Sequence, residues 1–99
     1  MSYVCILEIQ LHFPDNGSLK GKRKELSSLK AQLQRRFGAA VAETDYHDLW
    51  QRAELTAALV GRDITDLGNR ASALERFVIS KFPEGAQVGR RLVSREDLL

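Results

Sequence analysis

The chain has 99 residues, of which 43% are hydrophobic and 28% are charged, with a formal net charge of +2 and one cysteine. This length supports one domain with its own core. The apolar runs are shorter than the roughly 18 residues that a membrane-spanning helix needs, and the first residues lack a signal-peptide pattern. A single cysteine, Cys5, forms no internal disulfide. The sequence therefore predicts a cytoplasmic protein of one domain, residues 1–99, without a membrane segment or a disulfide.

The first predicted element is a strand over residues 3–13, where apolar and polar side chains alternate. The apolar face carries Cys5, Leu7, Ile9 and Leu11. A turn follows in the sequence PDNGS. Leucines at helical spacing then predict an amphipathic helix over residues 19–36, with Ser18 as its N-cap and Gly38 at its end. The first third of the chain thus gives a strand followed by a helix.

The remaining elements repeat this arrangement after one additional strand. Residues 39–46 form a weak predicted strand, and residues 52–61 form a clearer one. Asp63 is the predicted N-cap of a second helix that ends at Lys81, and residues 86–94 form the last strand. The order βαββαβ predicts an α+β fold, the ferredoxin-like sandwich. In that fold a four-stranded antiparallel sheet, in the order 4-1-3-2, carries two helices on one face.

Positive charge is concentrated in the first predicted helix. Residues 19–36 contain seven cations and one acid, Glu25, so their net charge is +6 and the rest of the chain carries −4. Four of the cations lie in the first two turns: Lys20, Lys22, Arg23 and Lys24. The helix dipole disfavours cations there by about 0.3–1 kcal/mol each. This placement is typical of a helix that receives an anion, with Arg35, Arg36 and Arg52 as further candidate contacts.

Lys22 admits two interpretations because it lies on the same helical face as the leucines. In the first, its amine reaches over the end of the sheet and pairs with a carboxylate such as Asp45 or Asp48. In the second, Lys22 joins Lys20 and Arg23 in holding a phosphate or another anion. A carboxylate pair explains one lysine, whereas an anion site explains all four cations. The sequence leaves both interpretations open.

A second candidate group would share an end of the sheet with the helix start in this fold. It comprises His12, Asp45, His47, Asp48 and Trp50. These side chains are capable of metal binding or acid–base chemistry, but their spacing matches no metal or catalytic motif, so solvated charges are the favoured interpretation. Trp50 is expected to fill the end of the sheet rather than to stack on a base. Arg52 is expected to join the anion site or to pair with Asp48. No metal, cofactor or catalytic residue is predicted.

The outer face of the predicted sheet mixes apolar and polar side chains. Ile6, Ala58 and Val60 lie there among acids and amides, which favours a surface for self-association into a homo-oligomer. The same face lacks the aromatic pair with which an RNA-recognition motif stacks bases. The sequence therefore does not favour an ordinary RNA-recognition motif.

Two segments of the sequence, LHFPDNGSLKGKR and VAETDYHDLWQRAEL, closely resemble the YlxP-like proteins, a family of small bacterial proteins of unknown function. The resemblance extends over almost the whole chain and implies a ferredoxin-like fold. Genes of the family often lie beside genes for a translation initiation factor and a ribosome-binding factor, which implies a connection with translation or ribosome maturation. The family often has an acid where Gly21 stands, so the helix start is more positive in this chain.

Three hypotheses about function follow from the sequence and the resemblance. The leading one is a non-enzymatic protein that binds RNA or a ribosomal subunit through the first helix. Its candidate contacts are Lys20, Lys22, Arg23, Lys24, Arg35, Arg36 and Arg52. The second is a small-anion or hydrolytic site formed by residues 13–24 and 45–52. The third is a structural subunit of a homo-oligomer.

Overall fold

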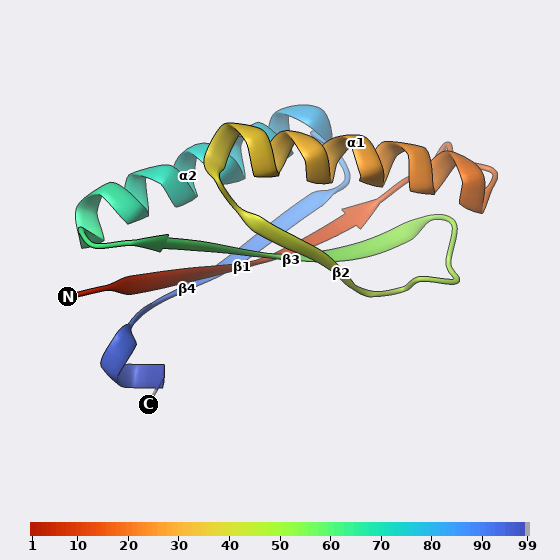
Figure 1. The fold of residues 1–99 in the computed structure, drawn as a ribbon. Coiled ribbons are helices and arrows are strands. Elements are labelled where there is room, and N and C mark those ends of the chain that lie inside the picture. Colours follow the sequence, from red (N-terminus) through yellow and green to blue (C-terminus); the bar gives the residue numbers. More distant parts are fainter. Residues whose placement is uncertain (99) are drawn as a thin grey trace.

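The computed structural model describes residues 1–98 and has the element order βαββαβ, followed by a short 3-10 helix. The strands are β1 (Tyr3–His12), β2 (Ala40–Asp45), β3 (Arg52–Gly61) and β4 (Ala86–Ser94); the helices are α1 (Leu19–Phe37), α2 (Ile64–Lys81) and η1 (Arg95–Leu98). Figure 1 shows α1 and α2 side by side over one face of the sheet. The predicted α+β, ferredoxin-like architecture is confirmed.

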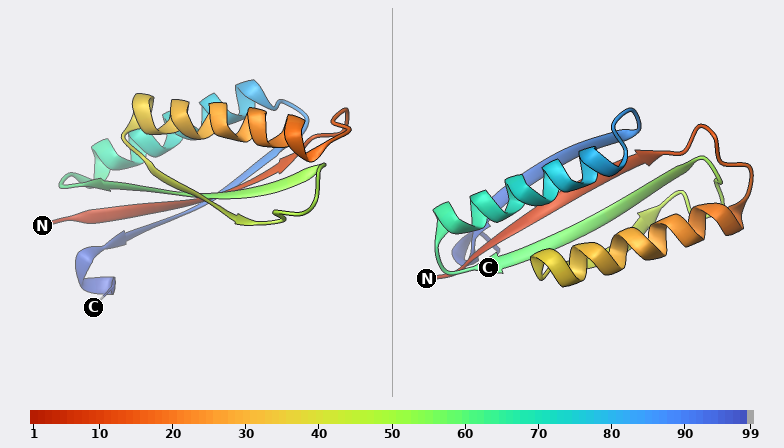
Figure 2. Two further views of the ribbon diagram at one scale, coloured as in Figure 1. Left: turned by 45° about the vertical axis from the view of Figure 1, so that its right-hand side comes forward. Right: turned by 90° about the horizontal axis from the view of Figure 1, so that it is seen from above.

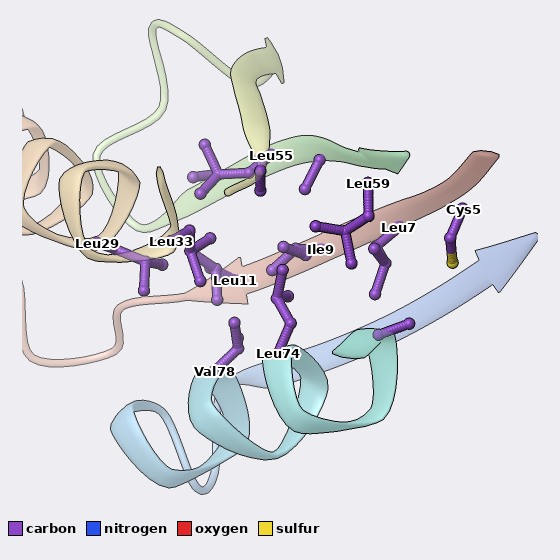
Figure 3. Close-up of a cluster of buried hydrophobic side chains, with 14 of the residues drawn as sticks. Cys5, Leu7, Ile9, Leu11, Leu29, Leu33, Leu55, Leu59, Leu74 and Val78 are labelled. Carbon is purple, nitrogen blue, oxygen red and sulfur yellow. The ribbon is translucent and has the colours of Figure 1, made fainter. Parts of the chain in front are cut away.

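The sheet is antiparallel, and its strand order β2-β3-β1-β4 is the predicted order read from the opposite edge. The register pairs Leu7 with Ala57 and Ile9 with Leu55, so the apolar faces of the two central strands point to the same side. Leucines of both helices cover that side, and together these side chains form the core shown in Figure 3. Cys5 lies in this core, where burial raises the pKa of its thiol and the positive charge of Arg90 opposes the rise.

The helices begin and end where local sequence signals predict. Ser18 Oγ accepts a hydrogen bond from Gly21 N (3.0 Å), and Asp63 Oδ1 accepts one from Asp66 N (2.9 Å). Helix α1 ends at Gly38, whose φ of 65° lies in the left-handed region that glycine adopts without strain. Within residues 1–98, neither helix has the length and apolar character that crossing a membrane requires.

Three connections meet at one end of the molecule, which we call the rim. They are residues 13–18 before α1, residues 46–51 between β2 and β3, and the turn after α2. Both figures show the first two connections together at the start of α1 (Figures 1 and 2). Phe13 N donates a hydrogen bond to Gln51 O (2.8 Å), and the Phe13 ring meets the Phe82 ring edge-on at 5.4 Å between centroids. The fold therefore brings the basic helix start next to the segment 46–51.

Candidate functional site

Lys22 is a fully buried lysine at the rim, with an exposed fraction of 0%. It lies on the leucine-bearing face of α1, one turn before Leu26, so its side chain extends over the end of the sheet. The Nζ atom donates hydrogen bonds to Tyr46 O (2.5 Å) and Leu49 O (2.6 Å). It also lies 3.4 Å from Glu43 Oε2. Two N–H groups of the buried ammonium therefore donate to carbonyl oxygens of the protein, and its charge lies beside a carboxylate, so the structure favours the carboxylate-pair interpretation of Lys22 over the anion contact.

The carboxylate that pairs with Lys22 is Glu43, not Asp45 or Asp48. Side chains alternate between the two faces of the sheet along β2. Ala42 and Thr44 point to the open face, so Glu43 between them points toward the helices. Its Oε2 atom is buried and accepts no hydrogen bond from residues 1–98, so the ammonium neutralises it mainly through charge. The alternation of side chains along β2 was the signal that could have identified this pair from the sequence.

Asn16 is a second side chain that holds the segment 46–51, and the sequence analysis did not single it out. Its Nδ2 atom donates to Ser18 O (2.7 Å) and to Trp50 O (2.5 Å). One amide thus joins the N-cap residue of α1 to the β2–β3 connection. Gly21 leaves room for this contact, because a Cβ at position 21 would lie 2.5 Å from Asn16 Oδ1. Any larger side chain at position 21 therefore requires the Asn16 side chain to move.

The other cations at the start of α1 are exposed. Lys20, Arg23 and Lys24 are solvent-facing, and none of them forms an ion pair with any residue in 1–98. The first turn of α1 contains no acid that could offset them. Three of the four cations that the sequence placed here therefore remain available to a ligand.

Two shallow grooves flank this row of cations. The groove between α1 and β2 has a volume of 470 Å³, with Arg23 and Lys30 among its lining residues. The groove between α1 and the end of α2 has a volume of 570 Å³, with Lys24 and Lys81 among its lining residues. Helix α1 thus forms a cationic ridge with a depression on each side, and Lys20 stands at its rim end.

The remaining predicted cations lie apart from the helix start or have aromatic partners. Arg35 and Arg36 are in the last turn of α1, about 22 Å from Lys20 along the axis, where the helix dipole favours cations. The Arg36 guanidinium lies 4.7 Å from the centre of the Phe77 ring. The Arg52 guanidinium lies 4.1 Å from the centre of the Tyr46 ring instead of pairing with Asp48. These three arginines do not form one compact site with Lys20.

The structure does not gather the predicted acid–base group into a single cluster. His12 lies on the open face of the sheet, opposite Arg52, whereas His47 Nε2 lies 3.8 Å from Glu43 Oε1 near the helix side. Asp45 Oδ1 accepts a hydrogen bond from Tyr46 N (2.7 Å), and Asp48 is exposed. Among residues 1–98, no three His, Cys, Asp or Glu side chains are placed to hold a metal ion together.

Trp50 differs most from its expected position. It was expected to fill the end of the sheet, but 50% of it is exposed. The neighbouring Leu49 is 47% exposed, so the β2–β3 connection presents two large apolar side chains to solvent. The expectation that Trp50 is a packing residue is wrong because the end of the core is already closed by the Phe13–Phe82 pair and by the stem of Lys22.

The open face of the sheet has the mixed character that the sequence indicated. Val60 is exposed there, close to Ile6 and Ala58. At the rim end the face becomes polar, since Glu54 accepts hydrogen bonds from Gln10 Nε2 and from Thr44 Oγ1 (both 2.6 Å). Self-association through this face stays a prediction.

Comparison with known proteins identifies a matching family and supports the fold described above. A family model described as "Protein of unknown function (DUF503)" matches residues 4–88. No curated protein matches the sequence. Among solved structures, the chain is similar to the de novo designed protein Foldit4, with a TM-score of 0.65 and 10% identity over 96% of this chain and 99% of that one. It is also similar to a de novo designed protein with a ferredoxin fold, LFR1 1, with a TM-score of 0.44 and 14% identity over 90% of this chain and 83% of that one. At such identities the likeness to Foldit4 supports the fold alone.

Proposed function

The chain belongs to the DUF503 family, and from that premise we propose that it is a YlxP-like, non-enzymatic protein that binds RNA or a ribosomal subunit through α1. The observation that carries this proposal is the set of exposed cations Lys20, Arg23 and Lys24. They lie where the helix dipole opposes them, and they have no carboxylate partner within residues 1–98. A bound polyanion would offset both the dipole and the mutual repulsion of the cations.

The layout of the cations favours an extended anion over a small one. A small phosphate site needs donors that converge on one point. The cations of α1 instead form a row from Lys20 to Lys30, which extends about 15 Å along the helix axis. Such a row suits successive phosphates of a nucleic-acid backbone, and the grooves beside α1 give the backbone a surface to follow.

The proposal is tested by measuring the affinity for structured RNA and for isolated ribosomal subunits across a salt series. The variant Lys20→Ala/Arg23→Ala/Lys24→Ala removes three exposed cations from α1. The matched control, Arg62→Ala/Arg76→Ala/Arg95→Ala, removes three exposed cations elsewhere and changes the net charge equally. We expect the first variant to bind more weakly and to flatten the slope of log K against log salt by about 2–3, because each lost phosphate contact flattens it by about 0.7–0.9.

Equal slopes for the two variants would refute a role for the start of α1, since only the net charge would then matter. If this protein binds an acidic protein but has no measurable affinity for RNA, the proposal is refuted, and the cations of α1 contact a protein partner instead. The hydrolytic alternative has no observation in its favour, because its histidines and aspartates do not converge.

A further inference from the structure

The β2–β3 connection, residues 46–51, is held unusually firmly for a surface loop. Four of its carbonyl oxygens accept hydrogen bonds: those of Tyr46 and Leu49 from Lys22 Nζ, that of Trp50 from Asn16 Nδ2, and that of Gln51 from Phe13 N. Leu49 N also donates to Tyr46 O (3.1 Å), which closes a turn inside the loop. Surface loops are normally the mobile part of a fold. This one is hydrogen-bonded to Phe13 directly after β1, to Asn16 and Lys22 at the start of α1, and within itself.

Two of the hydrogen bonds that hold the loop come from the buried ammonium of Lys22, and burying a charge is in itself unfavourable for stability. Removing a lysine ammonium from water costs several kcal/mol even when a carboxylate compensates for part of it. A methionine at position 22 would complete the leucine-bearing face of α1 without that cost. The ammonium adds what methionine lacks, namely a fixed conformation of residues 46–51. A loop that is already ordered loses less conformational entropy when it binds a partner.

The loop presents a tryptophan as its largest exposed side chain. Trp50 is the one tryptophan of the sequence, and within residues 1–98 every other aromatic side chain is buried or half-buried. Arg52 covers one face of the Tyr46 ring. A single exposed apolar residue is ordinary, but here hydrogen bonds hold the backbone that carries the exposed aromatic side chain.

The surroundings of Trp50 indicate what it contacts. The Asn16 amide joins Trp50 O to Ser18 O, so the tryptophan backbone lies beside the N-cap of α1. The exposed cations begin two residues later, at Lys20. The loop residue that carries the exposed aromatic ring therefore lies near the start of the row of cations. Proteins combine aromatic side chains and cations to hold single-stranded nucleic acid, because the bases stack on the rings and the phosphates pair with the cations.

We propose that Trp50 is a stacking platform for an unpaired base of RNA, and that Lys22 and Asn16 are positioning residues that fix the platform. This inference rests on the proposed function, since it names the form of RNA that the α1 surface recognises. The cations of α1 bind any RNA backbone, whereas Trp50 adds a preference for unpaired over paired nucleotides. Asp48 on the same loop is exposed, and its negative charge disfavours a phosphate group placed next to it.

The fluorescence of Trp50 provides the test, because no other tryptophan contributes. The probes are a single-stranded 12-nucleotide RNA and a duplex of the same length. We expect the single strand to quench the emission and the duplex to leave it nearly unchanged. Binding by variants that lack the tryptophan is followed through a dye attached to the RNA. Trp50→Ala is expected to weaken single-strand binding by about 5- to 150-fold and to leave duplex binding unchanged. Trp50→Phe retains a stacking ring and is expected to recover most of the loss. Leu49→Ala, the adjacent control, is expected to have no effect.

The outcomes separate this inference from the proposed function. RNA binding that depends on the α1 cations but is the same in wild type and Trp50→Ala overturns the stacking platform alone. Equal losses in Trp50→Ala and Leu49→Ala also overturn it, because RNA affinity would then depend on the apolar surface of the loop in general and not on a stacking ring. No RNA binding by the wild type overturns the proposed function, and the inference with it.

The positioning role is tested with Asn16→Ala, which removes one loop contact from a partly exposed position. We expect the anisotropy of Trp50 emission to decay faster, and the affinity for the single strand to fall while duplex affinity stays the same. Lys22→Met is expected to show the same changes more strongly if it folds. Unchanged anisotropy decay in Asn16→Ala, with the fold intact, would contradict the positioning role.

Discussion

The two helices begin with similar caps and opposite charges. Ser18 caps α1 and Asp63 caps α2, and each side chain accepts a hydrogen bond from a backbone N–H three residues on. The first turn of α2 contains Asp66, as the helix dipole favours, whereas the first turn of α1 contains Lys20 and no acid. The start of α2 thus follows the rules that maximise stability. The start of α1 departs from them, and the proposed function attributes this departure to a polyanion that binds there.

A second contrast lies within α1 itself. Lys22 is enclosed by the protein, while Lys20 and Arg23 project into solvent without carboxylate partners in residues 1–98. Neighbouring cations therefore have different roles: one fixes the adjacent loop, and the others remain free for a partner. Net charge alone does not distinguish these roles, but side-chain burial does.

The largest expected effect on stability is that of Lys22→Met. The substitution leaves Tyr46 O, Leu49 O and the Glu43 carboxylate without their buried partner, so we expect a loss of about 3 kcal/mol of unfolding free energy in urea. Lys24→Met, an exposed control on the same helix, is expected to change it by less than about 0.5 kcal/mol. Equal effects of the two substitutions would contradict the separation of enclosed and free cations.

The pairing of Lys22 with Glu43 is measured by adding Glu43→Gln to Lys22→Met. Glutamine carries no charge, so the double variant is expected to be more stable than the sum of the two single changes predicts, by about 1 kcal/mol. Additive effects in the same urea experiment would show that the ammonium acts through the two carbonyls alone.

The next largest effect is expected from Asn16→Ala. It removes the hydrogen bonds to Ser18 O and Trp50 O, so we expect a loss of about 1–2 kcal/mol in thermal or urea unfolding. Asp15→Ala, at the exposed neighbouring position, serves as the control. If both variants had the same unfolding free energy, the hydrogen bonds of Asn16 would contribute nothing to the stability of the protein.

Charge reversal at the two helix starts is expected to have smaller and opposite effects. Lys20→Glu places an acid in the first turn of α1 and should raise the unfolding free energy by about 0.3–1 kcal/mol. Asp66→Lys places a cation in the first turn of α2 and should lower it by a similar amount. Calorimetry of both variants at low salt measures the difference directly. If both substitutions changed the unfolding free energy in the same direction, the charge contrast between the two helix starts would be contradicted.

The smallest expected effect concerns Asp48. Removing its charge with Asp48→Asn lowers the repulsion of a phosphate backbone near Trp50, so we expect the affinity for single-stranded RNA to rise by about 2-fold. Glu96→Gln, an exposed acid in η1, is the control. A rise that is equal in both variants would reflect net charge and not the position of Asp48.

The fold could be predicted from the sequence because its signals are local. The alternation around Ile9, the caps Ser18 and Asp63, and Gly38 each act within a few residues. The site was harder to predict because its contacts join distant segments. The Lys22–Glu43 pair spans two elements, and Asn16 reaches Trp50 across the rim. Whether Trp50 is covered depends on how Phe13 and Phe82 close the end of the core, and periodicity carries no information about that.

The central claim is that the start of α1 carries cations for a polyanion at the expense of helix stability. Measuring unfolding free energy and RNA affinity on the same preparation of Lys20→Glu tests it most directly. The account predicts that stability rises while RNA affinity falls and its salt dependence weakens. A more stable variant that binds RNA as tightly as the wild type, at every salt concentration, would contradict it.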